Sequence, residues 1–326
     1  MEEPKTLQEA ILYFADTDRC IAYLMQSRWP DGVVVCPTCG RKDMSYVPKR
    51  RVWQCKSRHA KCQFSIKVGT IFEGSPVPLG KWLAAMWMMA NCKNGISSWE
   101  VHRALGVTQK TAWFMMHRVR MVLRDERIHK FDGPVESDET YIGPDPRKMH
   151  KDRKAKYHAQ TSRGERGGRY VGKTAVHGVL DRELRQVRTK VLKNVKRETL
   201  QDAVLSQVSP AASVYTDDSA AYDDLGRHFV HEVVNHAKEY VNGQIHTQGI
   251  ENYWSLLKRT LRGTYIAVEP FHLDRYLDEQ AFRYNNRATR DNPLNDADRF
   301  ALAVTQIIGK RLTYGELTGR EEARPF

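Results

Sequence analysis

The chain has 326 residues, 41% hydrophobic and 28% charged, a balance that excludes disordered and fibrous classes and gives room for two or three domains. A net charge of +13 indicates a polyanionic partner, with nucleic acid as the first candidate. No uncharged run approaches the roughly 18 residues that span a bilayer, and the polar start MEEPKTLQEA is unlike a secretory signal. We therefore expect a cytoplasmic protein with no membrane partner. The first predicted element is a helix over about residues 7–26.

Two pairs of cysteines follow this helix. Cys36 and Cys39 belong to CPTCG, a tight turn from which two thiolates reach one tetrahedral zinc ion, and Cys55 and Cys62 come next. The second pair is spaced CxxxxxxC with His59 inside the gap, so either all four cysteines bind or His59 replaces one of them. We favour four cysteines around a structural Zn²⁺ that does no chemistry.

Three helices are expected between about residues 79 and 125. The apolar run KWLAAMWMMANC forms the first, Gly106 makes a tight turn after the second, and Thr108 caps the third. Helix, short turn with glycine and helix is the helix-turn-helix pattern. Gln109, Lys110 and Thr111 lie in the first turn of the last helix, where such helices contact DNA, although the pattern also fits a packing module.

The second half of the chain alternates strands and helices. Strands are expected over about 135–143, 170–180, 186–192, 213–217 and 231–235, with one helix near 199–207 and two amphipathic helices after residue 248. This order predicts a mixed α/β sheet of the ribonuclease H kind, with the first and fourth strands adjacent at its centre. Residues 144–169 are rich in Lys, Arg and Gly, which fits a solvated loop or one that grips phosphates.

Three carboxylates occupy compatible positions in this arrangement. Asp138 lies within the first strand and Asp217 ends the fourth, so adjacent strands would bring them side by side. Glu251 starts the next long helix, where the helix dipole favours a carboxylate. Converging oxygen atoms suit Mg²⁺, and two such ions support in-line phosphodiester displacement.

Other acids near these positions are expected to lie elsewhere. Glu139 should point to the face opposite Asp138, and Glu136 is expected off the Asp138 face and beyond ligand reach. Asp138 alone would also fit a solvent-facing residue on an edge strand. Asp218 could stand in for Asp217, but neighbouring side chains diverge at a strand end.

The helix after residue 248 leaves further alternatives open. Glu251 could serve only the helix dipole, with His246 as the real third ligand. Lys258 and Arg259 lie one to two turns beyond Glu251 and are candidate phosphate contacts. A solvated basic face explains that pair equally well.

Six segments together resemble bacterial insertion-sequence transposases with an N-terminal zinc ribbon and a DDE catalytic domain. The combination is specific, whereas no single segment is. The segments are CPTCG, GTIFEGSPVPL, SDETYIG, VYTDDSAAY, HTQGIENYWSLLKRTLRGTY and HLDRYLDEQAFRYNNR. The resemblance implies that Asp138, Asp217 and Glu251 are the three acids and hold two Mg²⁺ or Mn²⁺ ions per active site. The wide spacing of Cys55 and Cys62 departs from the family pattern.

The resemblance also implies a domain order and an activity. We expect N-terminal helices and a zinc ribbon over residues 1–75, a helix-turn-helix domain over 76–130 and a ribonuclease H-like catalytic domain over 131–326. Such an enzyme binds terminal inverted repeats, nicks DNA and transfers the strand to target DNA, as a homodimer or higher oligomer in the nucleoid. The alternatives are a non-catalytic DNA-binding regulator and a nuclease of the same fold; three converging acids argue against the regulator.

Overall fold

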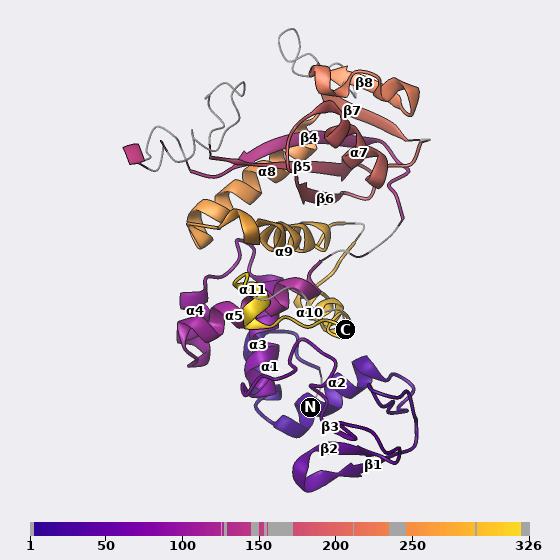
Figure 1. Ribbon diagram of the computed structural model, residues 1–326, viewed down its shortest axis with the longest axis vertical. Coiled ribbons are helices and arrows are strands. Elements are labelled where there is room, and N and C mark those ends of the chain that lie inside the picture. The colour runs from indigo at the N-terminus through magenta and orange to yellow at the C-terminus, as the bar shows by residue number, and fades with distance from the viewer. Residues whose placement is uncertain are drawn as a thin grey trace. The chain divides into compact units, whose positions relative to one another are not determined.

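The computed structural model describes residues 3–124, 126, 129–144, 150–152, 155, 172–210, 212–234, 246–290 and 292–320 (Figure 1). The chain forms two compact units. One contains residues up to Arg124 together with those from Asn286 onward, and the other spans Asp125–Asn285. No helix in the described ranges is both long and apolar enough to cross a membrane.

The first unit opens with two helices and a small antiparallel sheet. The single helix expected over about residues 7–26 is interrupted, because the Asp16 side chain accepts a hydrogen bond from the Asp18 backbone and starts a second helix. The elements are α1 (Leu7–Tyr13), α2 (Thr17–Arg28), β1 (Met44–Val47), the 3₁₀ turn η1 (Pro48–Arg50), β2 (Val52–Cys55) and β3 (Gln63–Phe64).

The three expected helices follow, and two C-terminal helices complete the same unit. Gly106 ends the second helix in the left-handed conformation, with a φ of 58°. Phe300 of the C-terminal segment packs against Trp87, with ring centroids 5.0 Å apart. The elements are α3 (Leu79–Asn91), α4 (Ser98–Leu105), α5 (Gln109–Val122), α10 (Asp296–Thr305) and α11 (Tyr314–Leu317). Residues 286–320, assigned by sequence to the catalytic domain, therefore pack with the first unit.

A five-stranded mixed sheet forms the centre of the second unit. Its order is β6-β5-β4-β7-β8, with antiparallel pairing among the first three strands and parallel pairing from β4 through β7 to β8. The first and fourth strands in sequence are thus adjacent, as predicted. The strands are β4 (Val135–Ile142), β5 (Thr174–Asp181), β6 (Gln186–Val191), β7 (Ser213–Asp217) and β8 (Val230–Val234).

Helices cover both faces of this sheet (Figure 1). One apolar cluster joins the sheet to α7 (Arg197–Gln207), and another joins the opposite face to α8 (Gln248–Thr260) and α9 (Leu273–Asn285). Gly178 permits the close approach of α8, because a Cβ there would lie 2.6 Å from the Trp254 ring. Shorter turns are η3 (Ala220–Tyr222), η4 (Leu225–Arg227), the π-helical η5 (Leu261–Tyr265) and η6 (Pro270–His272).

Candidate active site

The two faces of β4 carry different acids. Asp138 lies on the face that α8 covers, because its Oδ2 accepts a hydrogen bond from Trp254 Nε1 at 3.0 Å. Glu139 lies on the opposite face, where the Tyr222 hydroxyl donates to its carboxylate. Alternation along the strand therefore separates these neighbours as predicted.

Glu136 shares the Asp138 face, which corrects the expectation that it lies off that face and out of reach. Residues two apart on a strand point the same way. The Glu136 carboxylate is 1% exposed and accepts hydrogen bonds from Ile250 N and Arg182 Nε, both at 2.8 Å. A Cβ at Gly249 would lie 2.9 Å from Glu136 Oε2, so a larger residue there would displace the carboxylate. The buried carboxylate thus binds the N-terminal turn of α8, where a negative charge is favoured.

Asp217 ends β7 beside Asp138. The two strands run parallel with Glu136 opposite Tyr215, so the residues two positions further along, Asp138 and Asp217, share a face on adjacent strands. The Thr247 hydroxyl donates to Asp217 Oδ1 at 3.3 Å. The structure therefore brings these two predicted acids to one side of the sheet centre.

The environment of Asp138 disfavours its ionised form. Burial raises its pKa to about 7, and the negative charges of Asp217 and Glu139 act in the same direction. Such a carboxylate is stabilised by a bound cation or by a proton.

Glu251 lies on the face of α8 that contacts both aspartates. Thr247, Glu251, Trp254 and Lys258 recur at spacings of four, three and four residues, which places them along one side of the helix. The Glu251 side chain is exposed between the two residues that bond the aspartates. The ligand atoms of the three acids do not form a group within 4.8 Å of one another in the described chain.

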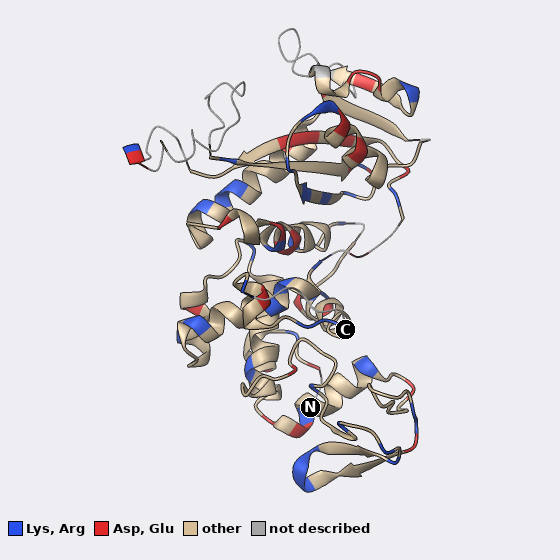
Figure 2. Cartoon of the chain, in the orientation of Figure 1, with Lys and Arg blue, Asp and Glu red and all other residues tan. Residues whose placement is uncertain are grey.

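The alternatives considered for this site lie elsewhere. His246 belongs with Glu136, since its Nδ1 is 3.5 Å from Glu136 Oε1 and its carbonyl accepts from Arg182. Asp218 is exposed beyond the end of β7. Arg259 is exposed on α8, about 100° around the helix from Lys258. Figure 2 shows the basic residues gathered toward the C-terminal end of α8.

The ribbon cluster contains three cysteines and a histidine instead of four cysteines. The ligand atoms of Cys36, Cys39, Cys55 and His59 all lie within 4.8 Å of one another. Cys36 Sγ is 3.5 Å from His59 Nε2, and Cys39 Sγ is 3.6 Å from Cys55 Sγ. Cys62 lies outside the group, and its carbonyl accepts from Cys55 N across the hairpin. His59 lies in the β2–β3 loop, and its imidazole reaches the cysteines of the CPTCG turn. The sequence spacing does not reveal that these side chains are close.

This donor set fits zinc. A backbone hydrogen bond at Arg41 contributes most to lowering the pKa of Cys39, to about 6. The thiolate form, which binds metal, is therefore favoured. Three thiolates and one imidazole are a common tetrahedral zinc set.

The first turn of α5 makes contacts within the protein. Gln109 Nε2 donates to a serine hydroxyl of α4 at 2.8 Å, and Thr111 N donates to Thr108 Oγ1 at 3.1 Å. Lys110 Nζ lies 4.7 Å from the centre of the Tyr314 ring, although the lysine remains exposed. These contacts position the turn.

Comparison with known proteins identifies two domain types in the chain. Residues 130–285 match the ISXO2-like transposase domain, and residues 15–63 match the transposase zinc-ribbon domain. An uncharacterized protein in transposable element ISH50 of Halobacterium salinarum is 30% identical over 256 residues, which cover 76% of this chain and 84% of the relative.

A solved structure, the simian T-cell lymphotropic virus intasome in complex with PP2A regulatory subunit B56 gamma, contains a chain that is 11% identical. That match covers 59% of this chain and 66% of the other, just under two thirds, and its TM-score of 0.28 supports no conclusion. The domain matches and the archaeal relative are sufficient: the chain belongs to the ISXO2-like DDE transposases with an N-terminal zinc ribbon, enzymes of the polynucleotidyl transferase class.

Proposed function

We propose that this transposase nicks DNA at the ends of its element and joins the 3′-hydroxyl to target DNA, with Asp138, Asp217 and Glu251 acting at the scissile phosphate. The observation that best supports this is the position of both aspartates on adjacent strands under α8. Thr247 and Trp254 bond the two carboxylates on either side of Glu251. One element therefore orients the whole acid set.

The acid pair fits a divalent cation. Asp138 and Asp217 repel each other in a partly buried setting, which contributes to the raised pKa of Asp138, and a cation between them would remove that repulsion. Hard oxygen donors suit Mg²⁺ or Mn²⁺. Two such ions, when bound, lower the pKa of an attacking water or 3′-hydroxyl and stabilise the departing oxygen. Glu251 would complete one of the two metal sites from the helix.

DNA contacts are proposed from both units. Lys258 shares the Glu251 side of α8, and with Arg259 it would contact phosphates near the acids. Gln109, Lys110 and Thr111 would meet terminal repeats from the first turn of α5. The net charge of +13 supports a polyanionic partner. Most of the basic segment 144–169 lies outside the described residues. Assembly as a homodimer or higher oligomer on DNA completes the proposal.

Amide substitutions test the acids. Asp138→Asn, Asp217→Asn and Glu251→Gln keep side-chain size but remove the charge that would hold a cation. Each should abolish Mg²⁺-dependent cleavage and strand transfer on DNA carrying the element's ends, with DNA binding retained. Matched controls are Glu139→Gln, on the opposite face of β4, and Asp218→Asn, which is exposed. Both should keep most activity.

The outcomes separate the competing functions. Strong activity in Glu251→Gln, or equal loss in Glu139→Gln, would overturn the assignment of the acids. Cleavage without joining by the unaltered protein would indicate a nuclease of the same fold. Specific binding without either reaction would indicate a regulator.

A further inference from the structure

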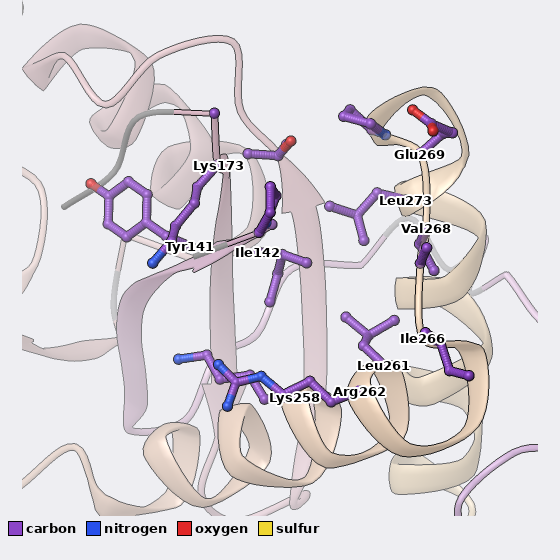
Figure 3. Close-up of a pocket in the computed structure, with 16 residues that line it drawn as sticks. Tyr141, Ile142, Lys173, Lys258, Leu261, Arg262, Ile266, Val268, Glu269 and Leu273 are labelled. Atoms are coloured by element: carbon purple, nitrogen blue, oxygen red, sulfur yellow. The ribbon is translucent and has the colours of Figure 1, made fainter. Parts of the chain in front are cut away.

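A pocket of about 230 Å³ opens where the ends of β4 and β5 meet the end of α8 and the start of α9 (Figure 3). Its lining includes apolar side chains from these elements and from the segment that joins α8 to α9. They are Ile142, Pro144, Leu261, Ile266, Val268 and Leu273. Ile142 is four residues beyond Asp138 on the same face of β4, so the wall of the pocket at Ile142 lies about 13 Å from Asp138 along the strand.

Three cations line one side of this pocket. The nitrogen ends of Lys173, Lys258 and Arg262 lie on the side of Tyr141, whereas Glu269 lies at the opposite end (Figure 3). In the described part of the chain, none of the three cations forms an ion pair. Burial and the neighbouring charge of Arg262 lower the pKa of Lys258. Like charges gathered this closely are relieved by a bound anion.

The segment that forms the outer rim has an unusual backbone. The end of α8 widens into the π-helix η5, a feature often found at functional sites. Ile266 then has φ 63° and ψ −59°, and Ala267 N donates to Tyr265 O at 2.7 Å, which is the rare γ-turn of the strained kind. A β-branched residue is an outlier in this region. The turn leaves the Ile266 side chain 82% exposed at the pocket.

We infer that this pocket receives one unpaired nucleotide of the bound DNA, with its base against the apolar side chains and its phosphate on Lys173, Lys258 and Arg262. The inference rests on the proposed DNA cleavage and joining. A nucleotide combines an apolar ring with an adjacent anion, which matches an apolar cavity with a cationic side. The volume admits a single base but no base pair. An unstacked base needs an apolar surface to replace its lost stacking.

The position of the pocket explains what such binding would achieve. A distance of about 13 Å corresponds to about four base-pair rises of DNA. Holding one base out of the helix that close to the acids would open the duplex at the cleavage point and fix the strand for in-line attack.

A base-by-base scan tests this inference. Full-length protein is mixed in Ca²⁺ with an element-end duplex carrying 2-aminopurine at single positions within four nucleotides of the cleavage point. We expect a several-fold rise in fluorescence at one position. Ala267 is exposed at the pocket, so Ala267→Trp fills it without displacing a packed side chain. This variant should lose the fluorescence rise and reduce strand transfer about tenfold or more, as expected when one base loses its binding surface. In the Ala267→Trp variant, DNA with an abasic nucleotide at that same position should restore strand transfer.

Two further variants complete the test. Val195→Trp adds the same side chain at an exposed site outside the pocket and should change nothing. Arg262→Gln should reduce the slope of log affinity against log salt by about 0.9, the value for one lost phosphate contact.

The results distinguish the two levels of the proposal. Two results would overturn nucleotide binding in the pocket and leave the proposed function intact. The first is normal cleavage and joining with no rise in 2-aminopurine fluorescence at any position. The second is a fluorescence rise that Ala267→Trp does not change. Absence of cleavage and joining by the unaltered protein overturns the proposed function and the pocket with it.

Discussion

Replacing Glu136 by glutamine should weaken catalysis through the N-terminal turn of α8. The carboxylate is 1% exposed and holds Arg182 Nε and Ile250 N, each at 2.8 Å. Glutamine fills the same space but offers one acceptor atom, so one of the two hydrogen bonds is lost and the charge attraction between this side chain and Arg182 is removed. Breaking a buried ion pair costs about 3–5 kcal/mol, and a hydrogen bond to a charged group about 1.5–3. Because glutamine keeps one bond, we expect a loss of about 2–3 kcal/mol in the free energy of unfolding.

Two measurements detect the effect. Urea unfolding measures the stability loss, and strand transfer at saturating DNA measures the displacement of Glu251 with its helix. A shift of about 1 Å can cost about 100-fold in rate, so kcat should fall while DNA affinity is unchanged. Glu139→Gln is the matched control. Its Tyr222 donor can bond the glutamine carbonyl equally well, so this variant should lose about 1 kcal/mol or less and keep its kcat.

Two results would refute this reasoning. If Glu136→Gln has the stability and kcat of the unaltered protein, the carboxylate does not hold the helix. If both variants lose stability and kcat equally, the effect is general to buried acids of β4 and not specific to α8.

The remaining predictions concern the ribbon and a buried histidine. We expect metal analysis to find one zinc ion per chain in the unaltered protein and none in Cys55→Ser or His59→Ala, with loss of folding stability because structural zinc contributes directly to folding. Cys62→Ser should keep its zinc. Loss of zinc from Cys62→Ser but not from His59→Ala would instead support a site of four cysteines. Burial lowers the pKa of His177 to about 4, below about 6.5 in the unfolded chain. The unfolded chain therefore binds the proton more readily, and stability should be complete above pH 6.5 and fall by about 3 kcal/mol as the pH drops toward 4. Urea unfolding across this range should show a flatter curve for His177→Gln, and an identical curve contradicts the prediction.

Local patterns in the sequence were sufficient to predict the strands and main helices of the catalytic unit. Strand alternation predicted β4 and the opposite orientations of Asp138 and Glu139. The order of strands and helices predicted that β4 and β7 are neighbours, and hence that Asp138 and Asp217 lie together. These features follow from the two-residue period of a strand and from chain connectivity, both of which are readable without distances.

The same period puts Glu136 on the Asp138 face, so our expectation for Glu136 was wrong, and its partners could not be read from the sequence. Arg182 and Ile250 are 46 and 114 residues away along the chain. A carboxylate that binds distant donors has the same local pattern as one that faces solvent. Only the packing of α8 on the sheet distinguishes the two.

Sequence by itself determined the strands and main helices of the catalytic unit, the zinc ribbon and the strand positions of the two aspartates, because these depend on residue periodicity, turn chemistry and short motifs. Tertiary structure alone decided that His59, and not Cys62, lies with Cys36, Cys39 and Cys55, and that Lys173 and Arg262 join Lys258 around one pocket. Periodicity shows which side of an element a residue occupies. Which side chains meet there depends on loop paths and on packing between segments far apart in the chain, and these are set by the energy of the whole fold.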